Sequence, residues 1–209
     1  MHRFRTLSII HTQNAVFECI YDNNTASSGG HGSNTDGADT IYSSHITFRN
    51  WTVDNGDDSL SLKLIRRIFL SMIASSTMGS RLHAKGNTYN NTLHAAYFKT
   101  WTGEQVGYPP NGAGGGLGFA ADLLFEDMQA TNLRSAPFTI SQCTTFSDTE
   151  GNCTSSKFEI YDISFKSIQG TTEGTADVAS FQCSAVKPCR NIMITDIDLV
   201  VASNGTNVN

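Results

Sequence analysis

Three aspartates lie close together in one short segment of the chain, WTVDNGDDSLSLK at residues 51–63. Asp57 and Asp58 are adjacent, and Asp54 precedes them by three positions. Carboxylates this close repel one another, which raises the pKa of one of them and keeps it protonated near neutral or mildly acidic pH. Glycoside hydrolysis uses such a pair, because one carboxyl group protonates the leaving oxygen while the other activates water or attacks the sugar carbon.

A further aspartate, Asp36, precedes Asp57 by 21 residues. In a repeating β-structure this separation is about one repeat, so the two turns would stack and bring the carboxyl groups together. Two other interpretations compete. An Asp in a turn commonly caps backbone N–H groups, which is the role we expect of Asp39 and Asp54. The DNGDD segment also suggests calcium, but it lacks the order of ligands found in an EF-hand loop.

The elements that must position these residues are predicted to be short strands. Several segments alternate apolar and polar residues and then meet Asn, Gly, Asp or Thr, which is typical of a strand followed by a turn. They are HITFRNWTV at 45–53, LLFEDMQAT at 123–131, FEIYDISFKSIQGT at 158–171 and NIMITDIDLVV at 191–201. The last three begin about 33 to 35 residues apart, which favours a solenoid of stacked coils. An antiparallel sandwich is the alternative fold.

Two stretches interrupt this pattern. Residues 62–78 carry apolar side chains at helical spacing, but the segment is too short and too basic to cross a membrane. Residues 104–119 contain two prolines and six glycines and are predicted to be a loop. Those glycines do not have the spacing of a phosphate-binding loop.

Length and charge limit the number of domains and the classes of partner. We expect 209 residues without an abrupt change of composition to form a single domain over 1–209, in which 62–82 is an atypical segment. Charged residues make up 16% of the chain and the formal net charge is −5, which argues against nucleic acid and membrane surfaces as partners. We expect a monomer without a metal or cofactor.

The five cysteines fit neither a zinc site nor a redox CxxC motif. Cys143 and Cys153 are ten residues apart and Cys183 and Cys189 are six apart, which favours two local disulfides and leaves Cys19 over. Five N-x-S/T sequons also suggest secretion. They begin at Asn23, Asn50, Asn90, Asn152 and Asn204. The N-terminal segment, however, has an apolar run too short for a signal peptide, so we expect a fragment.

NTDGADT at 34–40 and DNGDDSLSLK at 54–63 resemble the NTDG and (N/G)DD motifs of glycoside hydrolase family 28, the polygalacturonases and their relatives. YFKTWTG at 97–103 stands where that family carries its R-I-K motif, and the likeness covers most of 34–60 and 83–205. It is greatest to the fungal exo-acting branch, which includes exopolygalacturonases and rhamnogalacturonan-directed enzymes. The resemblance implies an all-β fold, a single-stranded right-handed parallel β-helix, here incomplete at both ends. It also implies a secreted enzyme that hydrolyses pectic polysaccharide with inversion.

The resemblance assigns roles to individual residues. Asp57 matches the general acid, while Asp36 and Asp58 match the carboxylates that position and activate water. In an inverting enzyme the acid and the base stand about 6.5 to 9.5 Å apart, leaving room for that water. Lys99 matches the lysine of R-I-K and suits a galacturonate carboxylate. Asn34 is expected to orient groups within the site.

Three aromatic residues are candidates for substrate contacts, and one of them departs from the family pattern. Tyr97 stands where endo-acting members have arginine, which removes a bidentate carboxylate contact and argues against endo-polygalacturonase specificity. Trp101 and Tyr108, near the glycine-rich loop, are candidates either to stack on a sugar or to anchor that loop.

A catalytic-site histidine is missing from its usual place. The family's G-H-G motif should follow the aspartate pair by about one coil, but residues 46–82 contain no histidine. His31 belongs to a GHG that precedes NTDG, and we expect a loop histidine there. His83 is no better placed, and the pattern around His94 predicts an ordinary surface position.

The chain is also shorter than family members, which predicts a truncated or aberrantly spliced product in which 62–82 replaces roughly a coil. Activity would then be weak or absent, because a misplacement of about 1 Å can cost on the order of a hundredfold in rate. Three functions stay open. They are a pectin hydrolase, an inactive solenoid that binds pectic polysaccharide, and a calcium-stabilised scaffold.

Overall fold

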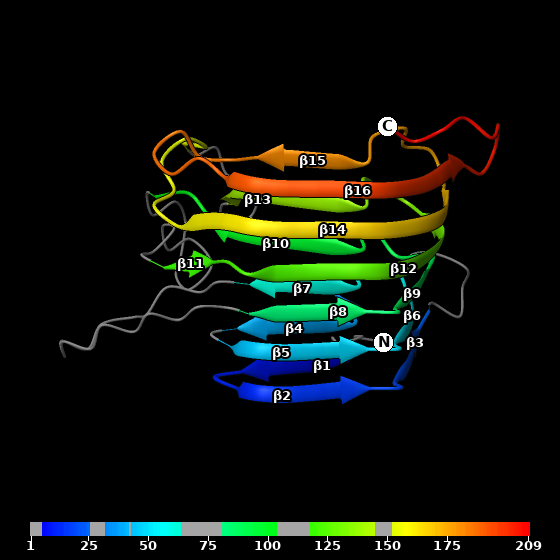
Figure 1. The fold of residues 1–209 in the computed structure, drawn as a ribbon, viewed down its shortest axis with the longest axis horizontal. Coiled ribbons are helices and arrows are strands. Elements are labelled where there is room, and N and C mark those ends of the chain that lie inside the picture. The colour runs from blue at the N-terminus through cyan, green and yellow to red at the C-terminus, as the bar shows by residue number, and fades with distance from the viewer. Residues whose placement is uncertain (1–5, 26–31, 42, 64–80, 104–117, 145–151) are drawn as a thin grey trace.

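The computed structural model describes residues 6–25, 32–41, 43–63, 81–103, 118–144 and 152–209. These residues form strands and turns, and the strands rise from β1 and β2 at one end of the molecule to β15 and β16 at the other (Figure 1). The pairings between these strands are all parallel, which excludes the antiparallel sandwich for this part of the chain. The described residues contain no helix long and apolar enough to cross a membrane.

Two sheets contain these strands. The first consists of β1 (Leu7–Ile10), β4 (Ala38–Ile41), β7 (Leu60–Lys63), β10 (Ala96–Trp101), β13 (Phe138–Thr144) and β15 (Ala179–Gln182). The second includes β2 (Gln13–Glu18), β3 (Tyr21–Asn24), β5 (Ser44–Arg49), β6 (Thr52–Asn55), β8 (Leu82–Lys85), β9 (Thr88–Asn90), β12 (Leu123–Leu133), β14 (Glu159–Thr172) and β16 (Arg190–Val201). The short strand β11 (Phe119–Ala120) pairs with β14.

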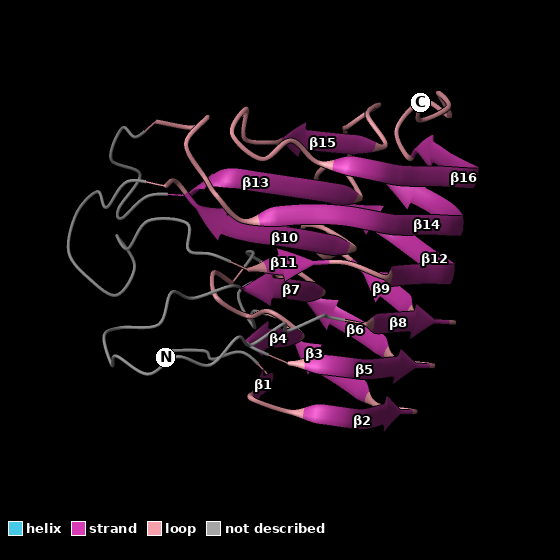
Figure 2. Ribbon diagram, turned by 60° about the vertical axis from the view of Figure 1, so that its left-hand side comes forward, coloured by secondary structure: helices cyan, strands magenta, loops and turns pink. Residues whose placement is uncertain are grey.

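Consecutive strands form rungs that stack on one another. A rung is one strand of the first sheet with the strands of the second sheet that follow it, so β4, β5 and β6 make one rung and β7, β8 and β9 the next. The first-sheet strands run opposite to β2, β5 and β8, as Figure 2 shows. In the first sheet, stacking places Ala38, Leu60, Ala96 and Phe138 in one column of register. Residues that precede or follow these four by the same number of positions therefore also stack on one another.

The interior between the sheets is filled by large apolar side chains. Phe138 stacks on Phe165 with ring centroids 3.9 Å apart, and Phe165 also contacts Phe125 at 5.2 Å. Trp51 packs edge-on against Phe48 at 4.9 Å and is 1% exposed. Because burial of apolar area stabilises by about 25 cal/mol per Å², this interior is the main support for the stacked rungs.

Asparagines occupy corners of the rungs. Asn91 and Asn132 both adopt the left-handed backbone conformation, with φ of 57° and 56°, which asparagine tolerates better than most residues. The side-chain amide of Asn132 donates a hydrogen bond of 3.1 Å to Asn91 Oδ1 in the rung below. Stacked corners are thus joined by side chains as well as by the backbone.

Most strand predictions are confirmed. The segments 123–131 and 191–201 lie in β12 and β16, and 158–171 lies in β14 except for its first residue. Residues 45–53 instead form two strands, β5 and β6, because the chain turns at Asn50, where φ is 53°. The interrupting segments fall largely outside the described residues, which omit 64–80 and 104–117.

Both predicted disulfides are present. Cys143 is bonded to Cys153, and Cys183 is bonded to Cys189. Cys19 is free and exposed. The first bond links β13 to the segment that follows it, the second lies between β15 and β16, and neither involves the strands next to the aspartates.

Candidate active site

The predicted carboxylates belong to two turns that lie one above the other. Asp36 precedes β4, and Asp57 and Asp58 precede β7, the adjacent strand of the same sheet. These strands begin on the right-hand side of Figure 1, beside β6 and β9. The backbone N–H of Gly37 donates to the Asp58 carbonyl at 2.9 Å, so hydrogen bonds continue from strand to strand into the turns. The turn before β4 therefore stacks on the turn before β7, which brings the aspartates of the two turns close together.

Asp57 is held by main-chain donors on both oxygens. Its Oδ2 accepts the N–H of Asn34 at 2.6 Å, and its Oδ1 accepts the N–H of Asp58 at 3.1 Å. The buried side chain of Asn55 fixes the same turn, since Oδ1 accepts from the Asp57 N–H and Nδ2 donates to the Asp58 carbonyl, both at 3.1 Å. Asn34 thus contacts the acid through its backbone, and the plane of the Asp57 carboxyl group is set by the fold.

Burial distinguishes the three acids. Asp36 and Asp58 are 3% and 5% exposed, whereas Asp57 is only partly buried. Gly37, between the turns, allows their close approach. A Cβ at this position would lie 2.7 Å from the Ser59 carbonyl oxygen, which is closer than real Cβ contacts. The outermost carboxyl group is therefore Asp57, with the other two behind it.

His94 joins this group, and the prediction of a surface position is wrong. It is 7% exposed and lies just before β10, in the rung above the aspartate pair. Its Nε2 lies 4.0 Å from Asp58 Oδ1, and its Nδ1 lies 2.8 Å from the Ala136 carbonyl oxygen. Burial lowers the pKa of His94, and the hydrogen bond to Ala136 and the charge of Asp57 partly oppose that effect. No local sequence signal marks His94, because its alignment with Asp58 follows from the register of Ala96 with Leu60, which is set by strand pairing.

The predicted substrate-binding residues of β10 share one face of that strand. Tyr97, Lys99 and Trp101 alternate with buried residues, so all three point to the same side. The ring of Tyr97 lies 4.9 Å from that of His94, and Lys99 Nζ lies 5.6 Å from the Tyr97 ring centroid. Burial raises the pKa of Tyr97, and the negative charge of Asp58 adds to this.

Trp101 ends β10 with its indole N–H buried. No hydrogen-bond acceptor for Nε1 is present among the residues that the structure describes. Its ring is partly buried, so either of its predicted roles is compatible with this position. The predictions for Tyr108 and His31 lie outside the described residues.

Comparison with known proteins shows the family. A family model described as "Glycosyl hydrolases family 28" matches residues 2–209. The chain belongs to glycosyl hydrolase family 28. It is similar to alpha-L-rhamnosidase rgxB of Aspergillus niger, with 52% identity over 96% of this chain and 51% of the relative. It is also similar to exopolygalacturonase X-1 of Emericella nidulans, with 28% identity over 95% of this chain and 50% of the relative. The chain thus spans about half the length of these family 28 relatives.

Arg134 is a second site residue that the motifs of family 28 did not indicate. It follows β12, and its Nε donates to the Asn91 carbonyl at 3.1 Å while its Nη2 donates to the Gly56 carbonyl. The guanidinium therefore spans from its own rung to the turn that precedes Asp57. Its positive charge lowers the pKa of His94. No spacing in the sequence marks this residue, because the contact crosses two rungs.

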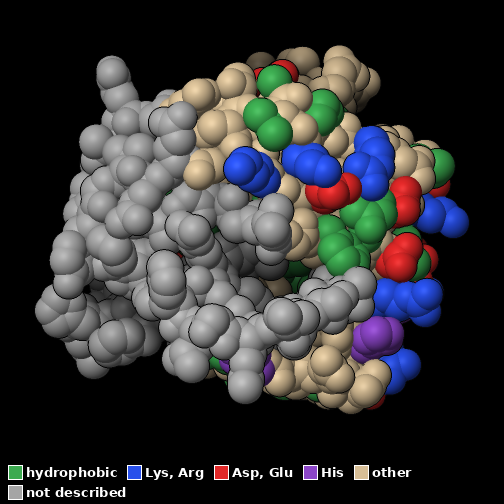
Figure 3. Space-filling model, turned by 90° about the vertical axis from the view of Figure 1, so that its left-hand side faces the viewer, with side chains coloured by type: hydrophobic (Ala, Val, Ile, Leu, Met, Phe, Trp, Pro, Cys, Tyr) green, Lys and Arg blue, Asp and Glu red, His purple; other side chains and the backbone are tan. Residues whose placement is uncertain are grey.

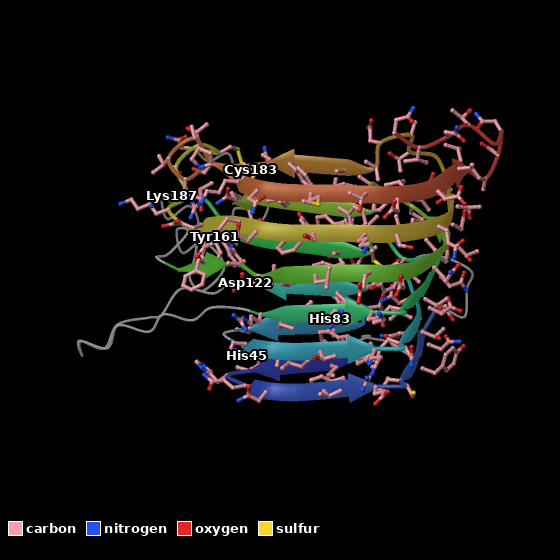
Figure 4. The ribbon with its side chains drawn as sticks, viewed as in Figure 1. His45, His83, Asp122, Tyr161, Cys183 and Lys187 are labelled. Carbon is pink, nitrogen blue, oxygen red and sulfur yellow. A yellow bond between two sulfur atoms is a disulfide. The ribbon has the colours of Figure 1, made fainter. Side chains whose placement is uncertain are left out.

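A separate charged cluster lies at the opposite ends of the first-sheet strands, where Figure 4 labels Tyr161 and Lys187. Lys187 and Arg190 both donate to Glu159, at 2.9 and 3.1 Å, and the Arg190 guanidinium lies 4.1 Å from the Tyr161 ring centroid. Figure 3 shows basic and acidic side chains next to one another on this side of the family 28 chain. These cations are paired with Glu159, whereas the contact described for Lys99 is with the Tyr97 ring.

The remaining candidates lie away from the acids. His83 is on β8 of the second sheet (Figure 4), and its Nε2 lies 2.9 Å from Glu126 Oε1. Within the described ranges, no group of three or more His, Cys, Asp or Glu residues is arranged to hold a metal ion. The hypothesis of a calcium-stabilised scaffold thus gains no site from this part of the family 28 chain.

Proposed function

We propose that this family 28 chain hydrolyses O-glycosidic bonds of pectic polysaccharide with inversion, releasing residues from the chain end. The observation that carries the proposal is the stacking of the Asp36 turn on the Asp57–Asp58 turn, fixed by the hydrogen bond from Gly37 to Asp58. Two buried carboxyl groups behind a more exposed one supply an acid and a base-side pair.

Asp57 is the general acid in this proposal. It gives its proton to the glycosidic oxygen as the bond to the anomeric carbon breaks, while a water molecule attacks that carbon from the opposite face of the ring. Asp36 and Asp58 orient this water and accept its proton, so the anomeric configuration is inverted. The two main-chain N–H groups on Asp57 keep its carboxyl group in place, which reduces the reorganisation needed during the reaction.

The face of β10 is proposed to bind the sugar. Lys99 offers a cation to a galacturonate carboxylate, Tyr97 and Trp101 offer ring faces, and Asn34 lines the acid turn. The relative at 52% identity is named an alpha-L-rhamnosidase, which supports rhamnogalacturonan as the substrate. The relative at 28% identity is named an exopolygalacturonase, which supports action at chain ends and makes galacturonan the second substrate to test.

We also propose that the rungs close into a single right-handed parallel β-helix and that the protein is a secreted monomer. Parallel stacking of successive rungs supports the first statement. Two disulfides support secretion, as do sequon asparagines that are exposed at Asn23, Asn50, Asn152 and Asn204. Neither nucleic acid nor membrane is proposed as a partner.

The test compares product release by the chain and by its Asp57→Asn variant. Rhamnogalacturonan and polygalacturonate are incubated at mildly acidic pH, and released sugars are separated chromatographically and their anomeric form followed by proton NMR. Asp54→Asn is the matched control, because Asp54 lies on the same segment but outside the proposed machinery. We expect the Asp57 variant to lose about 10²- to 10⁴-fold in rate and the Asp54 variant to retain most of it.

Two results would contradict the proposal. Equal rates for the chain and for Asp57→Asn would exclude Asp57 as the acid. Absence of product from a folded chain that still binds the polysaccharide would favour the inactive binding protein instead. Circular dichroism and thermal melting of each variant establish that the fold is intact.

A further inference from the structure

His94 occupies the same place in its rung as two of the acids do in theirs. Register aligns Ala38, Leu60, Ala96 and Phe138, so the residues two positions earlier form a column of Asp36, Asp58, His94 and Ala136. The backbone ladder continues through it, since the N–H of Ser59 donates to the His94 carbonyl at 3.0 Å. An imidazole therefore stands directly after the carboxylates in a fixed stack.

The neighbours of His94 determine which ring nitrogen faces the acids. A carbonyl oxygen only accepts hydrogen bonds, so the contact of 2.8 Å with Ala136 requires the proton on Nδ1. The hydroxyl of Thr139 lies 3.1 Å from the same nitrogen, and the ring of Tyr97 packs against the imidazole. Nε2 is thus the nitrogen that gains or loses a proton, and it faces Asp58 Oδ1 at 4.0 Å.

This contact is shielded from solvent. The side chains of His94 and Asp58 are 9% and 7% exposed, and a separation of 4.0 Å is short enough for a strong electrostatic interaction, although too long for a direct hydrogen bond. Five titratable or charged groups face the imidazole from the elements packed around it. They are Asp57, Asp58, Tyr97, Lys99 and Arg134. Burial lowers the pKa of His94, and Lys99 and Arg134 add to this, while the charge of Asp57 favours the imidazolium form.

We propose that His94 is a positioning residue for Asp58, attracting its carboxylate electrostatically when Nε2 is protonated and thereby linking the ionisation of the two side chains. The inference rests on the proposed function, in which Asp58 belongs to the base-side pair. No histidine is present at 46–82, and His94 supplies one to the acids from the next rung. Its effect on the reaction passes through Asp58 and does not require contact with the sugar.

The linkage can be measured without any catalytic assay. NMR titration of the His94 ring is compared in the wild-type chain, in Asp58→Asn and in the control Asp54→Asn, with His83 as an internal reference. We expect the His94 midpoint to fall by about one pH unit or more in Asp58→Asn and to be unchanged in Asp54→Asn, because an opposite charge at about 4 Å favours the imidazolium. An unchanged midpoint in a folded Asp58→Asn variant overturns the inference.

The reciprocal experiment covers the case in which Asp58→Asn does not fold. The side-chain carboxyl carbon of Asp58 is titrated in the wild-type chain and in His94→Gln, since linkage requires each group to move the other by the same factor. We expect the Asp58 midpoint to rise in His94→Gln by about the same amount. Identical Asp58 titration curves in the two proteins would refute the proposal.

Activity then separates positioning from a merely structural role. We expect His94→Gln to lower kcat by about 10- to 100-fold with little change in KM, and to move the acidic limb of the pH profile. Thr139→Val, which removes only the hydroxyl near Nδ1, should have a smaller effect. Unchanged kcat and pH profile in His94→Gln contradict the proposal. If the wild-type chain releases no product, the proposed function fails while the NMR titrations still decide the linkage.

Discussion

Replacing Gly37 by alanine tests whether the close approach of two rungs holds the acid turns together. A methyl group at this position would lie 2.7 Å from the Ser59 carbonyl oxygen and 3.0 Å from Val53 Cγ1. One neighbour is backbone and the other is a buried side chain, so the turns must separate by several tenths of an ångström. Overpacking of this kind costs about 1 to 3 kcal/mol. It also strains the hydrogen bond of 2.9 Å from Gly37 to Asp58.

Urea unfolding measures the first effect. With a slope of about 2 kcal/mol per molar urea, the midpoint should fall by about 0.5 to 1.5 M. The second effect is catalytic, and a displacement of the acids by part of an ångström should lower kcat by about tenfold or more. Gly174→Ala is the matched control, because a Cβ there would meet nothing within 4 Å. It should leave kcat unchanged and should not lower the urea midpoint.

Unfolding of Gly37→Ala at the same urea concentration as the wild type would show that the approach of the two turns tolerates a methyl group. A loss of stability with an unchanged rate would refute only the second step, in which the separation of the two turns determines the geometry of the acids. Equal losses in Gly37→Ala and Gly174→Ala would mean that the effect does not come from the contact between rungs, since the unfolded-chain effect of Gly→Ala is stabilising.

Further predictions concern the support of the stacked rungs. Cys183→Ser combined with Cys189→Ser should lower the free energy of unfolding by about 2 kcal/mol, because the closed loop is short, and calorimetry under non-reducing conditions measures it. Hydrogen bonds from Lys85 and His83 lower the pKa of Glu126, so the folded state binds that proton less tightly than the unfolded chain. The resulting stability is at most about 1 kcal/mol, is present above about pH 5 and is lost as the pH falls. Glu126→Gln should flatten the pH dependence of the melting temperature. A variant with the same pH dependence as the wild type would contradict this prediction. Trp51→Ala should cost about 3 to 5 kcal/mol by leaving a cavity beside Phe48, and a smaller loss in chemical denaturation would show that the interior collapses to fill it.

Local sequence predicted the elements of this protein well. Alternation of apolar and polar residues predicted β12, β14 and β16, because a strand that buries one face has an apolar residue at every second position. The close pairs of cysteines predicted both disulfides for a similar reason, since short separations restrict the partners. The break between β5 and β6 was missed, because the turn at Asn50 lies within a pattern that continues across it.

The aspartate motifs predicted which carboxyl groups form the candidate site. The separation of Asp36 from the aspartate pair suggested one repeat, and the structure places the two turns in contact. His94 escaped prediction because its side-chain environment depends on register with Asp58, which a residue's immediate neighbours do not encode. Arg134 was not predicted for the same reason, since it donates hydrogen bonds to the Asn91 and Gly56 carbonyls in lower rungs.

The sequence by itself therefore predicted most of the strands, both disulfides and the carboxyl groups of the candidate site, because these depend on nearby residues or on short motifs. Only the tertiary structure decided which side chains share a column. Rungs differ in length, so the residue that stacks on Asp58 cannot be found by counting a fixed repeat. Parallel hydrogen bonding sets that register over the whole sheet, and it places His94 beside the carboxylates and Tyr97 beside His94.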